Sequence, residues 1–73
     1  MNRLLTAIVE CDGDGYVALC PEVDVASQAE TVGDARENLA GALALYFETA
    51  SADEISRRTR GEVYVTQIEV AVG

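Results

Sequence analysis

Two short apolar stretches near the start of the chain flank a turn signal. Residues 4–10 are apolar and β-branched enough to predict a strand, and residues 16–20 predict a second one. Between them, Asp12-Gly13-Asp14-Gly15 supplies residues that tolerate the positive φ angles of tight turns. Pro21 cannot donate to a strand ladder and therefore marks a strand end. This stretch of the chain predicts a β-hairpin.

A third strand and a long helix are predicted next. Residues 23–30 predict a weaker strand, and Thr31 is suited to be the N-cap of a helix that follows. Asp34 lies three residues later, where the helix dipole favours a negative charge. Apolar residues then recur at helical spacing: Val32, Ala35, Leu39, Ala42, Leu43, Tyr46 and Ala50. The pattern indicates one helix with an apolar face.

The last third of the chain combines a polar stretch with an apolar one. Residues 51–61 are expected to be a connection, and they hold the cluster of Arg57, Arg58 and Arg60. Residues 62–72 predict a final strand that is apolar on both faces. Such a strand is either buried on both sides or pairs with another copy of the chain.

The predicted order is β-β-β-α-β within one domain spanning residues 1–73. We expect an α+β fold in which a small antiparallel-type sheet has one long helix packed on one face. The other face and the sheet edges then need protection. A core of this size supplies only roughly 3–5 kcal/mol, so we expect a homo-oligomer, either a dimer or a tetramer. The residues predicted to form its interface are Leu45, Val63, Val65, Ile68 and Val70.

The chain is strongly acidic, with 13 acidic residues against 5 basic ones and a net charge of −8. DNA would be repelled, so direct DNA binding is not expected. An acidic surface attracts basic proteins, although acidity can also serve solubility alone. No stretch approaches the ~20 apolar residues of a membrane span, and the start of the chain lacks the pattern of a signal peptide. We expect a cytoplasmic protein.

Side chains suited to catalysis are scarce. The sequence has neither histidine nor lysine, so the usual general bases and thiol activators are absent, and we expect neither an enzyme nor a cofactor. Glu10, Asp12 and Asp14 gather near the hairpin, but the loop is too short for a calcium site, and Asp-Gly is turn chemistry. We therefore expect no metal site. The spacing of Cys11 and Cys20 fits no zinc motif, and both are expected to be packing residues.

One set of residues resembles the signature of the N-terminal domain of HicB-type antitoxins. It consists of Gly15-Tyr16-Val17-Ala18, Pro21-Glu22, Gln28, Thr31, Ala35, Asn38 and Ala42-Leu43. The similarity covers residues 3–50, with Ala29 standing where the family usually has glycine. Many members of that family continue into a C-terminal DNA-binding domain. We expect this chain to be a short, single-domain member without one.

The resemblance implies a partial ribonuclease-H-like fold without a nuclease site. It also implies an antitoxin of a type II toxin–antitoxin pair, which binds and masks a small basic toxin that cleaves messenger RNA. From charge and location, we expect acidic side chains to take the place of RNA phosphates against that toxin: Glu10, Asp12, Asp14, Glu22 and Asp24. The alternative is an orphan oligomeric domain, structural or small-ligand-binding, with no toxin partner. A third hypothesis is a fragment that relies on a DNA-binding partner for repression.

Overall fold

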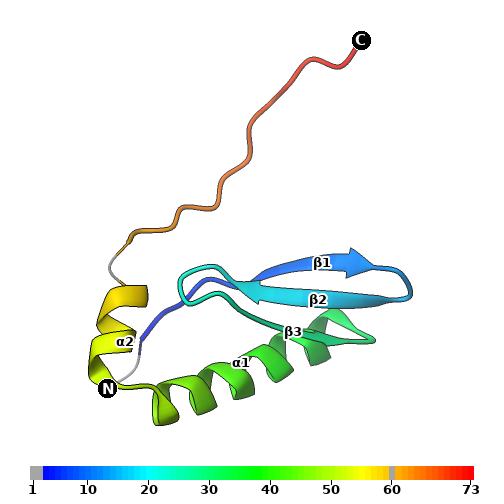
Figure 1. Ribbon diagram of the computed structural model, residues 1–73. Helices are drawn as coiled ribbons and strands as arrows, with labels where there is room; N and C mark the ends of the chain where they lie inside the picture. Colours follow the sequence, from blue (N-terminus) through cyan, green and yellow to red (C-terminus); the bar gives the residue numbers. More distant parts are fainter. Residues whose placement is uncertain (1–2, 60) are drawn as a thin grey trace.

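A three-stranded antiparallel sheet and two helices make up the domain (Figure 1). The computed structural model describes residues 3–59 and 61–73. The strands lie in the order β1-β2-β3. The element bounds are β1 Ile8–Asp12, β2 Gly15–Cys20, β3 Val25–Ala29, α1 Val32–Thr49 and α2 Ala52–Arg58. The predicted α+β class and the β-β-β-α arrangement are confirmed.

The hairpin between β1 and β2 closes with a two-residue turn. Asp12 lies opposite Gly15, which leaves Gly13 and Asp14 at the tip, and Gly13 has a φ of 61°. Gly15 is required for a different reason. A Cβ atom at this position would lie 2.8 Å from the backbone carbonyl oxygen of Ala29, because β2 and β3 approach closely there.

The first strand begins later than its apolar pattern predicts. The register pairs Ile8 with Leu19, so a longer ladder would place Thr6 opposite Pro21. Pro21 has no N–H to donate, and it ends the ladder. The backbone N–H of Thr6 bonds instead to the side chain of Glu22, at 2.9 Å from Oε2. Residues 4–7 therefore precede β1 as an extended segment and are not part of the strand.

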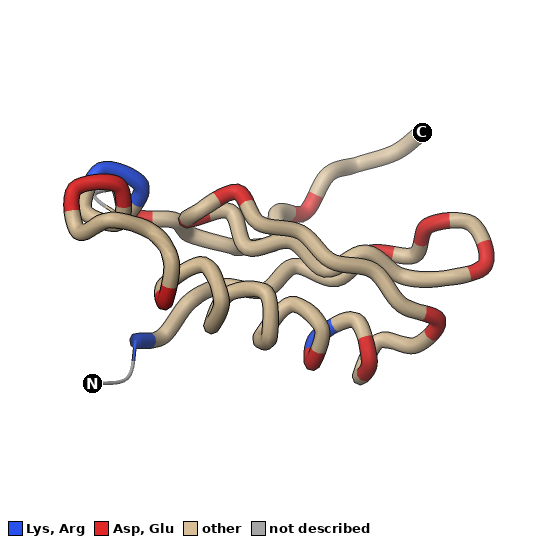
Figure 2. Tube along the Cα trace, turned by 60° about the horizontal axis from the view of Figure 1, so that its bottom comes forward, with Lys and Arg blue, Asp and Glu red and all other residues tan. Residues whose placement is uncertain are grey.

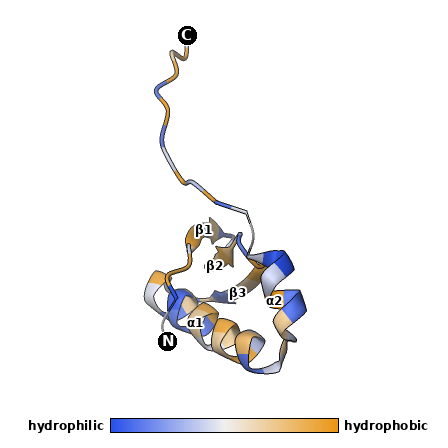
Figure 3. Ribbon diagram, turned by 90° about the vertical axis from the view of Figure 1, so that its left-hand side faces the viewer, coloured by the Kyte–Doolittle hydropathy of each residue, from blue (hydrophilic) through white to orange (hydrophobic). Residues whose placement is uncertain are grey.

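The long helix α1 covers one face of the sheet (Figure 3). Its N-cap is Thr31, as predicted: the hydroxyl of Thr31 accepts a hydrogen bond from the backbone N–H of Asp34 at 3.0 Å. The apolar face of α1 meets β2 and β3. The fully buried residues are Ala18, Cys20, Val23, Ala35 and Leu39. They form a small core, as expected for a chain of this length.

A second helix, α2, occupies the stretch that the sequence predicted to be a polar connection. Its N-cap Ser51 accepts a hydrogen bond from the backbone N–H of Glu54 at 3.1 Å. Acidic residues lie in its first turn and arginines in its last, which matches the helix dipole. Arg58 holds α2 against the body by donating to the carbonyl oxygen of Val23 at 2.9 Å. The prediction of a connection was wrong, and Arg60 lies outside the described residues.

The predicted last strand, residues 62–72, has no ladder partner within the described chain. The segment leaves the body of the domain in an extended course (Figures 1 and 3), and every residue from 61 to 73 is exposed. The prediction of a strand in the sheet of the single chain was wrong. Alternating apolar residues determine which side chains share a face, but they do not supply the neighbouring strand that a ladder requires.

Candidate protein-contact surface

Exposed carboxylates gather at the end of the sheet where the hairpin turns. Glu10 and Asp12 lie on β1, and Asp14 lies in the turn. β3 ends beside the start of β2, with Ala29 opposite Tyr16, and this brings further acidic residues to the same end. The acidic end, as we name it, consists of Glu10, Asp12, Asp14, Glu30 and Asp34, all of them exposed.

Acidic residues lie at both ends of the molecule. Figure 2 shows them around the hairpin and the start of α1, where one basic residue of α1 also lies, and again beside the arginines of α2 at the opposite end. One ion pair is present in residues 3–59 and 61–73, between Arg58 and Glu54 at 3.4 Å, and it lies within α2. The acidic end therefore presents its carboxylates to solvent without basic partners from the described parts of the chain.

The structure brings together only some of the carboxylates that the sequence assigned to toxin binding. Glu10, Asp12 and Asp14 lie at the acidic end, whereas Glu22 and Asp24 follow the other end of β2. The five steps from Gly15 to Cys20 separate the two groups by about 17 Å. The sequence reasoning missed Glu30 and Asp34. A meander returns the third strand to the start of the second, and that topology could have located both.

Glu22 is engaged in the fold. Its carboxylate accepts hydrogen bonds from the backbone N–H of Thr6 at 2.9 and 3.2 Å and from the Thr6 hydroxyl at 2.7 Å. Burial acts to raise the pKa of Glu22, but the hydrogen bonds from Thr6 and from its own backbone outweigh it, and the pKa lies below its ordinary value. The charged carboxylate thus joins the loop after β2 to the segment before β1. A toxin-binding role for Glu22 stays a prediction.

Asp24 is exposed and belongs to the turn between β2 and β3. Its φ of 56° is in the left-handed region, which Asp tolerates better than most residues. The neighbouring Val23 is buried in the core, and this burial anchors the turn to the body of the domain. This arrangement leaves the carboxylate of Asp24 at the surface, where its predicted toxin contact remains untested.

The sheet face that α1 does not cover carries both apolar and acidic side chains. Strand alternation places Val9 and Ala18 toward α1 and their neighbours on the outer face. The outer-face side chains are Ile8, Glu10 and Asp12 of β1 and Val17 and Leu19 of β2, with Ile8 opposite Leu19 and Glu10 opposite Val17. The apolar members are half-buried. The outer face thus joins an apolar centre to the acidic end.

The residues predicted to form an oligomer interface are accessible in the single chain. Leu45 is exposed on α1, and the others lie in the exposed C-terminal segment: Val63, Val65, Ile68 and Val70. None of them supports the core, so their contact role stays a prediction.

Cys20 is a core residue as expected, and burial raises the pKa of its thiol. Cys11 is exposed on β1, so the prediction that it is a packing residue was wrong.

A groove of 730 Å³ runs between α1 and the segment before β1. Leu5 and Ala7 line one side, and Leu39 and Phe47 line the other. The guanidinium of Arg3 lies 5.5 Å from the centre of the Phe47 ring.

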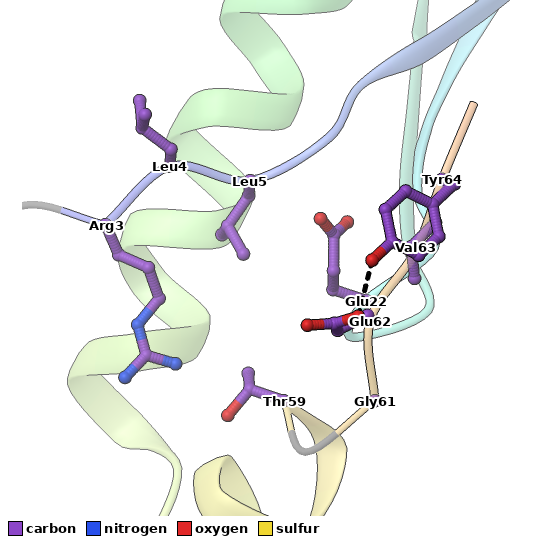
Figure 4. A pocket seen from close by; sticks show the side chains of 9 residues that line it. All are labelled: Arg3, Leu4, Leu5, Glu22, Thr59, Gly61, Glu62, Val63 and Tyr64. Atoms are coloured by element: carbon purple, nitrogen blue, oxygen red, sulfur yellow. Dashed lines mark hydrogen bonds between the residues drawn. The ribbon is translucent and has the colours of Figure 1, made fainter. Parts of the chain in front are cut away.

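A second pocket of 560 Å³ lies where the C-terminal segment leaves the domain. Figure 4 shows its lining, in which the hydroxyl of Tyr64 bonds to Glu62 and this bond raises the pKa of Tyr64.

Two further findings concern the described residues. Nowhere in residues 3–59 and 61–73 do three metal-binding side chains lie together. Neither α1 nor α2 is long and apolar enough to cross a membrane.

Comparison with known proteins gives one informative match. No family model matches the chain. No solved structure matches it. The chain is similar to a UPF0150 protein from Helicobacter pylori (strain J99 / ATCC 700824), with 30% identity over 69 residues. The match covers 93% of this chain and 96% of that protein. With both chains matched over nearly their whole length, this chain belongs to the UPF0150 protein family.

Proposed function

We propose that this protein is a HicB-like antitoxin that binds and masks a small basic mRNA-cleaving toxin. The outer face of the sheet carries the proposal, because Glu10 and Asp12 lie there beside an apolar centre made by Ile8, Val17 and Leu19. A protein contact needs an apolar area that excludes water and charges that complement the partner. This outer face offers both, and its charge has the sign that a basic RNA-binding surface requires.

The residues that carry the HicB-type resemblance mostly serve the fold. Gly15 permits the close approach of β2 to β3, and Ala35 is fully buried under the sheet. Thr31 caps α1, and the side-chain amide of Asn38 donates to the carbonyl oxygen of Gln28 at 3.2 Å. The resemblance therefore supports a shared architecture. Recognition of a particular toxin must come from other residues, and the acidic end is our candidate.

The proposed mechanism is competition for a cationic surface. A toxin that cleaves RNA must present cations to the phosphates of its substrate. Carboxylates at the acidic end would meet the same cations, and opposite charges would speed the encounter of the two proteins. The apolar centre would then exclude water and lengthen the life of the complex. RNA could not reach the covered surface.

Neutralising the acidic end tests this proposal. The double variant Asp12→Asn, Asp14→Asn removes two carboxylates from the hairpin, and Asp53→Asn removes one from α2 at the opposite end as a control. We expect the double variant to bind the purified toxin roughly tenfold more weakly, about 1.4 kcal/mol, in isothermal titration at low salt. The loss should shrink as salt is raised. Unchanged affinity, or an equal loss in the control, would show that the acidic end is not the contact.

A second candidate function rests on the groove beside α1. Its volume of 730 Å³ lies within the usual range of roughly 300–1,000 Å³ for small-molecule sites. An orphan oligomeric domain could hold an apolar ligand there without any toxin. Native mass spectrometry of the protein purified from its own cells would distinguish the two functions. A bound small molecule with no co-purifying basic protein would favour the ligand-binding domain.

A further inference from the structure

The C-terminal segment, residues 61–73, has the pattern of a strand but no strand beside it. Tyr64, Ile68, Val70 and Val72 alternate along one face, and they are 81%, 81%, 63% and 90% exposed. Val63 and Val65 add apolar surface to the other face. An extended backbone with apolar side chains on both faces is suited to a position inside a sheet. The single chain does not provide that position.

A free sheet edge is present on the same molecule. In the described parts of the chain, β1 pairs only with β2, so its second edge has unpaired backbone groups. Apolar side chains lie on both surfaces near this edge, and Glu10 and Asp12 of β1 also lie on the outer face. Leu39 and Phe47 line the groove between α1 and residues 3–7, the segment that leads into β1, and Ile8 and Leu19 lie on the outer face. A strand added here would pack one face toward α1 and would place the other face beside Ile8 on the outer face of the sheet.

Charge also matches the segment to this edge. The groove between α1 and residues 3–7 is lined by Arg3 and Arg36, two of the five basic residues of an acidic chain. The C-terminal segment carries Glu62 and Glu69 and no basic residue. Glu62 and Glu69 lie on opposite faces of an extended strand, so a strand of this sequence would bring one carboxylate to the side where arginines lie next to apolar side chains.

The segment does not use the free edge of its own chain. Gly61, Val63 and Tyr64 line a pocket together with Leu4 and Leu5, so the segment starts beside the residues that lead into β1 (Figure 4). It then diverges from the sheet (Figures 1 and 3) and remains exposed to its end. The segment extends away from its own domain, where a second copy of the chain can contact it.

We propose that residues 62–72 form a fourth strand on the free edge of β1 in a second copy of the chain, with the two copies exchanging their segments reciprocally. Twofold symmetry gives each donated strand an identical edge, so the assembly closes as a dimer and leaves no free segment. Strand addition supplies main-chain hydrogen bonds, and the side chains on both faces supply specificity. The dimer does not depend on the proposed antitoxin role, since both partners are this chain.

The mass of the full chain in solution gives the first test. Light scattering during gel filtration should report twice the 7.8 kDa chain mass. Ile68→Lys should convert the dimer to a monomer, whereas Gln67→Lys, which adds the same charge on the more polar face, should leave it dimeric. Neither residue belongs to the core, so both variants should keep the circular dichroism of the folded domain. A monomeric parent protein, or a dimeric Ile68→Lys variant, would overturn the proposal.

Disulfide trapping tests which edge receives the segment. Cys11 is exposed on β1, and it provides a native thiol near the proposed contact. Single cysteines placed at Tyr64, Thr66, Val70 and Val72, which share the face of Ile68, should include at least one that forms a disulfide-linked dimer with Cys11 on mild oxidation, because Cys11 lies on the side of β1 that faces α1. That dimer should disappear when Cys11→Ser is added. Links that persist without Cys11 would mean that the two segments pair with each other, and links within one chain would mean that the segment joins its own sheet. Either result would refute the exchange.

Discussion

The carboxylate of Glu22 offers the most detailed prediction for stability. The variant Glu22→Gln keeps the shape of the side chain but removes its charge and one of its two acceptor oxygens. Three donor–acceptor contacts from Thr6, at 2.7 to 3.2 Å, then cannot all persist. Hydrogen bonds to charged groups contribute roughly 1.5–3 kcal/mol, and partial solvent exposure reduces this to about 1–2 kcal/mol here. We expect a melting temperature lower by about 4–8 °C per kcal/mol lost.

The pH dependence of the free energy of unfolding follows from the direction in which the pKa of Glu22 is shifted. The pKa of Glu22 in the folded protein lies below its ordinary value of 4.5, so the unfolded chain binds the proton more tightly. The stabilising contribution is therefore fully present above the ordinary pKa, and it is lost as the pH falls through the lower folded pKa. Urea titrations between neutral and acid pH should show this loss in the parent protein and a reduced loss in Glu22→Gln.

Control variants distinguish the contribution of the hydrogen bonds to stability from the contribution of charge alone. Asp24→Asn neutralises an exposed carboxylate two residues away and should change stability by less than about 0.5 kcal/mol. Thr6→Val combined with Glu22→Gln should cost less than the sum of the two single changes, because both remove the same interaction. Equal stabilities of Glu22→Gln and Asp24→Asn, or fully additive effects of Thr6 and Glu22, would refute the reasoning. All variants need to be compared at one protein concentration, because the proposed dimer would add stability by mass action.

Two further pairs of variants test the approach of β2 to β3 at Gly15 and the packing of α1 on the sheet. Gly15→Ala should destabilise by about 1–3 kcal/mol, because its Cβ would lie 2.8 Å from the carbonyl oxygen of Ala29. Gly41→Ala should stabilise by about 0.5–1 kcal/mol, because it lies within α1 with nothing within 4 Å of the added atom. Leu39→Ala should cost about 2–5 kcal/mol, since Leu39 is 1% exposed, whereas Leu45→Ala should cost little at 60% exposed. Urea unfolding followed by circular dichroism measures each change. A stabilising Gly15→Ala, a destabilising Gly41→Ala, or equal costs of Leu39→Ala and Leu45→Ala would contradict the packing described.

Local signals in the sequence account for the elements that could be predicted. The Asp12-Gly13-Asp14-Gly15 turn lies between two apolar stretches, and the Thr31 cap precedes a long helical period. Each of these features acts over a few residues. The helix α2 was also visible in principle, because Ser51 and Glu54 have the spacing of a capping box. The polar composition of that stretch favours a connection, whereas its capping signal favours a helix.

The remaining features depend on distant parts of the chain. Glu22 bonds to Thr6, sixteen positions away, and charge alone could not indicate that pairing. Glu30 reaches the hairpin only because β3 returns beside the start of β2. The alternation in residues 62–72 is typical of a strand, but it does not identify a neighbouring strand, and the described part of the single chain pairs none with it. We place that neighbour in a second copy of the chain.

The central claim, that this chain is an antitoxin, is tested most directly by co-expression with the protein encoded in the adjoining reading frame. We expect that protein to be small and basic and to arrest growth when it is expressed alone. It should co-elute with this chain when the pair is purified through a tag on this chain. Growth should recover with the parent chain and recover less with Asp12→Asn, Asp14→Asn. A harmless neighbour that does not co-elute would contradict the account.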